Sequence, residues 1–183
     1  VRDEYTKNFI ESLGFKAINT GCPTLWGLDN SICESIPKTK SDKVVFTLTD
    51  YSKDIQNDSM LIQKLKDNYK QIYFWPQGIE DFHYLKTIVN NDLSDINIIS
   101  STLQDFDNYL KEGNTDYIGT RLHAGIFALQ HKIRTIILSV DYRASNMNYS
   151  NALPIFDRKK VKHLDSIINS SISLSNVVKK ENI

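Results

Sequence analysis

Short apolar runs rich in β-branched residues alternate with longer amphipathic stretches along the whole chain. The short runs predict strands, and the stretches with apolar residues three or four positions apart predict helices. The strand candidates are residues 16–20, 43–49, 71–75, 96–100, 116–120 and 135–140. The helix candidates are residues 3–13, 58–69, 79–89, 102–110, 121–130 and 157–169. This alternation of strand and helix is typical of an α/β protein.

Two of the predicted strands, around residues 44–46 and 136–138, are apolar without interruption. Strands of that kind are usually parallel and covered by helices on both faces. We therefore expect a doubly wound α/β fold, in which an open and mostly parallel sheet carries helices on both sides.

Signals for helix ends support this interpretation. Asn57 or Asp58 is a candidate cap for one helix, Ser101 or Thr102 for another, and Gly113 is placed to close the latter. Residues 21–41 show no clear periodicity, and they are interpreted as a long irregular loop.

Composition and charge exclude several classes of function. The 183 residues fit one domain, and 22 Lys and Arg balance 22 Asp and Glu, so no basic surface predicts nucleic-acid binding. No run of about 18 apolar residues predicts a membrane span.

The chain has two cysteines, Cys22 and Cys33, which form no CxxC motif and have no His nearby in sequence. We therefore expect a reducing compartment, and we expect neither cysteine to have a redox or nucleophilic role. The sequence opens with Val1 in a helix-like stretch, and we expect it to be a fragment.

The most informative junction between a strand and a helix is the segment 116–129. Ligands of open α/β sheets bind beyond the carboxyl ends of the strands. Gly119 at the strand end lets backbone approach a ligand, Thr120 is a candidate cap, and Arg121 and His123 fall in the first helical turn. This combination predicts an anion site, where a bound anion would raise the pKa of His123 and let it donate a proton near neutral pH. The alternative is that Arg121 and His123 make ordinary caps or ion pairs.

Three further junctions carry candidate residues. Asp141 and Arg143 follow another strand, where they either contact a ligand or pair with each other in the loop. After the strands at 43–49 and 71–75, Asp50 is a candidate base and Gln77 a hydrogen-bonding group. Tyr51 and Trp75 at these two junctions either stack on a sugar or pack in the core.

At residues 119–126, followed by 140–144 and preceded by 1–6, the chain resembles the polysaccharide pyruvyl transferase family. The segments 19–23 and 74–78 add to the resemblance, which covers nearly the whole chain. The resemblance implies a GT-B-like architecture of two Rossmann-like halves with the active site in the cleft between them. Residues 1–183 would then form a single α/β domain, the C-terminal half of a longer enzyme.

Members of that family transfer a pyruvyl group from phosphoenolpyruvate to a sugar of a cell-surface polysaccharide or glycan, and a pyruvate ketal results. By resemblance, Arg121 and His123 contact phosphoenolpyruvate, and Arg2 is a further anion-binding residue. Where many members carry an acidic residue before a proline, this chain has Cys22.

On this hypothesis His123 is the general acid, and either Asp141 or Asp50 is the base. The expected substrate-binding residues are Arg121, Arg2, Thr120, Gly119, Arg143 and Gln77. No metal or organic cofactor is expected, and the expected partners are phosphoenolpyruvate and a saccharide acceptor, free or lipid-linked. We expect a cytoplasmic protein, either dissolved or peripheral to the inner face of the membrane.

Two other functions fit the same features. A GT-B-type glycosyltransferase half-domain would use Arg121 and the helix end to hold a nucleotide sugar, and a non-catalytic carbohydrate-binding domain would keep the fold alone.

Overall fold

The core is a parallel sheet, seen in a computed structural model that describes residues 1–142, 144 and 153–174. Within these residues the sheet has six strands in the order β3-β2-β1-β4-β5-β6, and every neighbouring pair is parallel. The strands are β1 Lys43–Thr47, β2 Gln71–Phe74, β3 Ile96–Ile98, β4 Asp116–Gly119, β5 Arg134–Ser139 and β6 Ile155–Asp157. The order reverses between β1 and β4, as in Rossmann-like proteins, so the expected doubly wound fold is confirmed.

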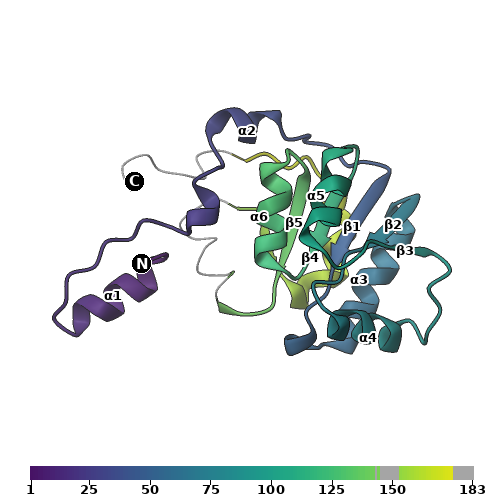
Figure 1. Ribbon diagram of the computed structural model, residues 1–183, viewed down its shortest axis with the longest axis horizontal. Coiled ribbons are helices and arrows are strands. Elements are labelled where there is room, and N and C mark those ends of the chain that lie inside the picture. Colours follow the sequence, from purple (N-terminus) through teal and green to yellow (C-terminus); the bar gives the residue numbers. More distant parts are fainter. Residues whose placement is uncertain (143, 145–152, 175–183) are drawn as a thin grey trace.

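Helices cover both faces of the sheet (Figure 1). The α-helices are α1 Glu4–Ser12, α2 Asn30–Ser35, α3 Ile55–Asn68, α4 Ile79–Ile88, α5 Leu103–Lys111, α6 Leu122–Gln130 and α8 Leu164–Ile168. Three short 3-10 helices are η1 Pro23–Leu25, η2 Asp50–Ser52 and η3 Arg158–His163. One hydrophobic cluster joins the sheet to α2, α5 and α6, and the other joins it to α3, α4 and α8.

The two clusters follow from the alternation of side chains along each strand. In β1, Val45 packs in the first cluster, whereas Val44 and Phe46 pack in the second. In β4, Tyr117 and Ile118 divide in the same way. Because both faces are buried, these strands need apolar residues at consecutive positions, which explains the uninterrupted runs in the sequence.

The predicted strand at residues 16–20 is wrong. This segment has no strand partner among the described residues, and its main chain instead bonds with Val1, which donates from its amino group to the Ile18 carbonyl and accepts from the Thr20 N–H. Ile18 is exposed, so the β-like alternation corresponds to no buried face. The adjoining α1 has no buried residue and stands apart from the sheet in Figure 1.

Other corrections concern short elements. β6 was not predicted, because three residues are too few for a periodic signal, and α2 lies within the stretch interpreted as an irregular loop. The predicted helix at 157–169 begins in β6 and continues as η3 and then α8. Asp54, rather than Asn57 or Asp58, caps α3, while Thr102 caps α5 and Gly113 closes it with a φ of 67°.

Every helix of the described part is too short or too polar to cross a lipid bilayer.

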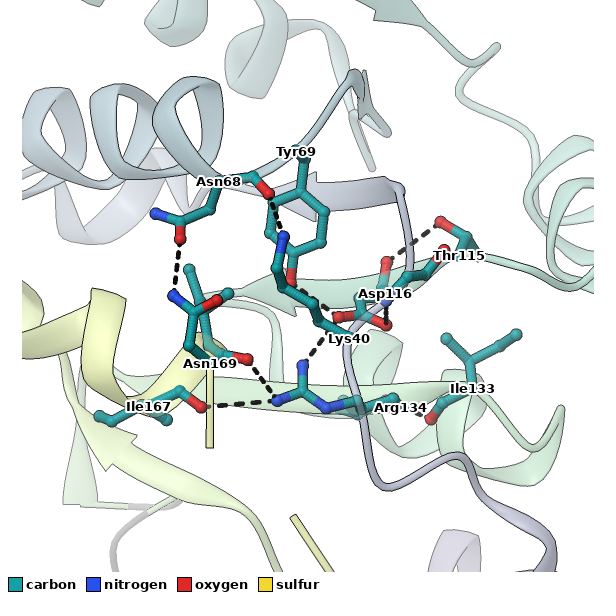
Figure 2. Close-up of polar contacts among 12 residues, drawn as sticks. Lys40, Asn68, Tyr69, Thr115, Asp116, Ile133, Arg134, Ile167 and Asn169 are labelled. Carbon is teal, nitrogen blue, oxygen red and sulfur yellow. Dashed lines mark hydrogen bonds and ion pairs between the residues drawn. The ribbon is translucent and has the colours of Figure 1, made fainter. Parts of the chain in front are cut away.

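Arg134, at the amino end of β5, binds residues 168–170 to the core, and these residues are called the C-terminal segment below. Its side chain is 1% exposed, and it pairs with Asp116 at 2.7 Å, while Tyr69 donates to the same carboxylate at 2.7 Å (Figure 2). The guanidinium also donates to the main-chain carbonyls of Ile168 at 2.7 Å and Ser170 at 3.0 Å. These carbonyls lie at and beyond the end of α8, so one side chain satisfies a helix end and a buried carboxylate together.

Gly119 is required by packing against the neighbouring strand. A Cβ built at Gly119 would lie 2.3 Å from Thr47 Oγ1 and 2.8 Å from the Thr47 main-chain nitrogen. Gly119→Ala is therefore expected to lower the free energy of unfolding by about 1–3 kcal/mol in a urea titration.

Gly78 offers a matched control, because it also lies at a strand-to-helix junction but has nothing within 4 Å of a built Cβ. Gly78→Ala is expected to lower the free energy of unfolding by less than about 1 kcal/mol, because Gly78 is the N-cap of α4 and Ala caps a helix less well than Gly. Equal losses in both variants would contradict the packing explanation.

Candidate active site

The candidate site lies where the strand order of the sheet reverses. The loops that follow β1 and β4 meet there, and ligands of doubly wound sheets bind at this position. A pocket of about 220 Å³ opens between these loops and the ends of β2 and β5. Its lining includes Tyr51, Gln77, Thr120, Arg121, His123 and Asp141. Five of the residues predicted to form the site are therefore brought together: Gln77, Thr120, Arg121, His123 and Asp141.

Arg121 is held in place by acceptors from the loop after β1 and from the first turn of α4. Its Nη2 donates to Asp50 at 2.8 Å and also to Asp81, and its Nε donates to the Leu48 carbonyl at 3.1 Å. The guanidinium lies 5.2 Å from the centre of the Tyr51 ring. Nη1 makes no hydrogen bond within the part of the chain that the structure describes. Arg121 is thus held through Nε and Nη2, and its Nη1 is the nitrogen left to donate to a ligand in the pocket.

Asp81 was missed by the sequence analysis. It lies in the first turn of α4, its residue is 1% exposed, and besides Arg121 it accepts from the main-chain N–H groups of Asp50 and Gln77. It therefore ties together the loops after β1, β2 and β4. The available signal was its position three and four residues before Tyr84 and Leu85, which places a carboxylate on the buried face of a helix.

Asp50 lies beside the pocket as the partner of Arg121. Burial raises the pKa of Asp50, but hydrogen bonding with Asp81 and the charge of Arg121 outweigh this effect, so the pKa lies below its usual value. Asp50 therefore remains a charged carboxylate that orients Arg121. A depressed pKa also makes it a weak proton acceptor.

The helix that carries His123 begins without a side-chain cap. Thr120 was predicted to cap α6, but its hydroxyl is buried and hydrogen-bonds with Thr49 at 2.8 Å. Arg121 occupies the N-cap position and makes no side-chain cap bond. By contrast, α3 and α5 are capped by Asp54 and Thr102. The first N–H groups of α6 therefore face the pocket edge without a cap, and helix ends of this kind attract anions.

His123 is exposed in the first turn of α6 and lines the pocket. Its Nε2 lies 3.7 Å from Cys22 Sγ, and Cys22 is in turn 3.1 Å from the Thr24 hydroxyl. The sequence analysis found no histidine near Cys22 along the chain, whereas the fold places one beside it. Contact across 101 residues carries no signal in a single sequence.

The other predicted residues differ in where they lie. At the pocket, Asp141 is half-buried and Gln77 is exposed. Gly119 does not line the pocket and instead packs against Thr47 in the neighbouring strand. Arg143 lies outside the described residues. Arg2 is partly exposed and pairs with Asp3 at 3.7 Å, and no contact of the described residues joins it to Arg121. Within the described residues, no group of three or more His, Cys, Asp or Glu side chains is arranged to hold a metal ion.

Comparison with known proteins gives a family and a fold. The family model described as polysaccharide pyruvyl transferase matches residues 1–142. A search of curated proteins found no match.

Two solved structures are similar. A UDP-GlcNAc 2-epimerase of Methanocaldococcus jannaschii, in complex with UDP-GlcNAc and UDP, has a TM-score of 0.57 and 17% identity over 100% of this chain and 57% of its own. MnaA of S. aureus, solved with UDP, has a TM-score of 0.53 and 12% identity over 97% of this chain and 55% of its own. The chain thus spans a little over half the length of each structure, and at these identities the likeness concerns the fold.

Proposed function

The chain belongs to the polysaccharide pyruvyl transferase family, and on that basis we propose that it binds phosphoenolpyruvate and transfers its pyruvyl group to a sugar as a ketal. The observation that carries this proposal is one pocket in which the Arg121 guanidinium, the uncapped start of α6 and His123 meet. Phosphoenolpyruvate presents a carboxylate and a phosphate, and both groups match the planar donors of Arg and the N–H groups of a helix end.

The charges at the pocket bear on how the donor is bound. Arg121 brings one positive charge, and its guanidinium already contacts the carboxyl groups of Asp50 and Asp81. Arg121 therefore cannot neutralise a multiply charged donor alone. The start of α6 and a protonated His123 supply part of the difference, and we propose that Arg2 and Arg143 supply the rest when the complete site is assembled.

The chemistry needs one acid and one base. We propose that His123, charged beside the bound anion, donates a proton to the methylene carbon while one sugar hydroxyl attacks the adjacent carbon and passes its proton to Asp141. A second hydroxyl then displaces the phosphate and its proton returns to His123, while Asp141 gives the proton that it received to the departing phosphate. The products are a pyruvate ketal and inorganic phosphate. Asp141 is preferred to Asp50 because Asp141 lines the pocket, whereas Asp50 lies beside it and its lowered pKa makes it a weak proton acceptor.

We also propose that the chain is the C-terminal half of a GT-B-like cytoplasmic enzyme whose other half closes the pocket. The coverage of the two similar structures supports this view, because each is nearly twice as long as the matched region. If it holds, the full-length enzyme should bind phosphoenolpyruvate more tightly than residues 1–183 alone.

Arg121→Lys tests the donor site. Lysine keeps the charge but loses the planar guanidinium that contacts Asp50 and Asp81 through Nη2 and leaves Nη1 to a ligand, so we expect phosphoenolpyruvate binding to weaken about tenfold or more. Isothermal calorimetry with the full-length enzyme measures the dissociation constant. An unchanged constant would contradict the assignment of Arg121.

A parallel titration with UDP-GlcNAc separates the proposal from the glycosyltransferase alternative. Binding of the nucleotide sugar, together with no binding of phosphoenolpyruvate, would favour that alternative.

A further inference from the structure

A second pocket adjoins the first, and its lining is more apolar. Its volume is about 230 Å³, and its walls are mainly apolar, among them Leu103, Phe106, Ile126 and Phe127. His123 and Gln77 line both pockets and so form the border between them. A pocket lined about equally by polar and apolar groups and a largely apolar pocket therefore meet at the side chain proposed to donate the proton.

The walls of this apolar pocket are rigid. Trp75 stacks on Phe106 with ring centroids 3.9 Å apart and an interplanar angle of 4°, and the indole donates to the Thr102 carbonyl at 3.3 Å. Trp75 and Phe106 are buried, so they act as a floor and not as exposed stacking platforms. Leu103, at 61% exposed, stands at the mouth.

Polar groups gather at the rim. Besides His123 and Gln77, the pocket is lined by Thr24 and Gln130, and Gln130 Nε2 donates to the Thr24 carbonyl at 2.6 Å. Apolar walls with a few polar groups at the edge are the usual make-up of a small-molecule site. The pocket's volume of about 230 Å³ has room for one sugar ring.

We propose that this pocket is the acceptor subsite, where one pyranose ring lays a C–H face against Leu103 and Phe127 and turns its hydroxyl edge toward His123 and Gln77. This inference rests on the proposed function, which requires an acceptor sugar next to the donor. Apolar walls suit the C–H face of a sugar, and the amide and hydroxyl groups of the rim suit its hydroxyls. The acceptor hydroxyls would then stand at the border with the donor pocket, where the ketal must form.

Saturation-transfer NMR on the full-length enzyme tests the subsite without turnover. The probes are methyl β-D-glucopyranoside and methyl β-D-galactopyranoside. We expect saturation of ring protons on one face of at least one of them, and no loss of this signal when phosphoenolpyruvate is added, because the donor occupies the other pocket.

Leu103→Trp fills the mouth of the pocket and should remove the saturation signal. Ile55→Trp is the matched control, because Ile55 is also the first residue of a helix and is 57% exposed, and it lines neither of these two pockets. The control should keep the signal.

Three results would overturn the subsite: no saturation with either glycoside, equal saturation in Leu103→Trp and in the unchanged enzyme, or displacement of the glycoside by phosphoenolpyruvate. A failure of the proposed function looks different. It would appear as no phosphate release from phosphoenolpyruvate, whatever the glycosides show.

Discussion

Replacing His123 with Gln is expected to lower the rate of pyruvyl transfer by about a hundred- to ten-thousand-fold. Glutamine keeps hydrogen-bonding groups at the pocket but cannot deliver a proton to the methylene carbon. Because His123 is exposed, the fold should be unaffected. The measurement is phosphate release by the full-length enzyme in the presence of a sugar acceptor, with circular dichroism as the check on folding.

His83→Gln is the control for this experiment. His83 lies in α4, is well exposed and faces Glu80 at 3.6 Å, and it lines neither the donor pocket nor the acceptor subsite. Its replacement should leave the rate unchanged. Near-normal turnover by His123→Gln would remove His123 from the chemistry and leave the acid to be sought elsewhere in the pocket.

Replacing Arg134 with Met is expected to lower the free energy of unfolding by about 3–5 kcal/mol. The change leaves the Asp116 carboxylate buried without its cation and strips the carbonyls at the end of α8 of their donor. Burial already raises the pKa of Asp116, and Tyr69 and Arg134 offset only part of this effect, so loss of Arg134 should make the charged carboxylate costlier still. Urea unfolding at neutral pH measures the loss.

Lys70→Met provides the comparison. Lys70 pairs with Asp42 at 2.8 Å, but both side chains are well exposed, and such pairs contribute little to stability because water screens the two charges. Similar losses in the two variants would show that burial of the Arg134 pair adds nothing to its effect.

Sequence pattern predicted the sheet because its central strands are buried on both faces. A run such as 44–46 must be apolar at every position, and this signal is local. The failures occur where the local signal is weak or misleading. β6 has three residues, and the alternation at 16–20 lies on a segment whose Ile18 faces outward.

The candidate site was predictable to the extent that it follows from topology. Ligand sites in this fold lie at strand ends, so Arg121, His123 and Asp141 could be selected from their positions after strands. Contacts between those junctions could not be predicted from the sequence. Asp81 meets Arg121 across 40 residues and Cys22 meets His123 across 101, and one sequence records neither pairing.

The way Arg134 holds the C-terminal segment bears on which sequences this fold tolerates. Its bonds go to main-chain carbonyls of Ile168 and Ser170, and every amino acid supplies a carbonyl. These bonds therefore do not depend on the side chain at position 170. The amino acid there can change as long as the main chain keeps its length and path. Deleting a residue in this stretch would shift the carbonyls out of register with Arg134, so related sequences should vary there by substitution and not by gaps.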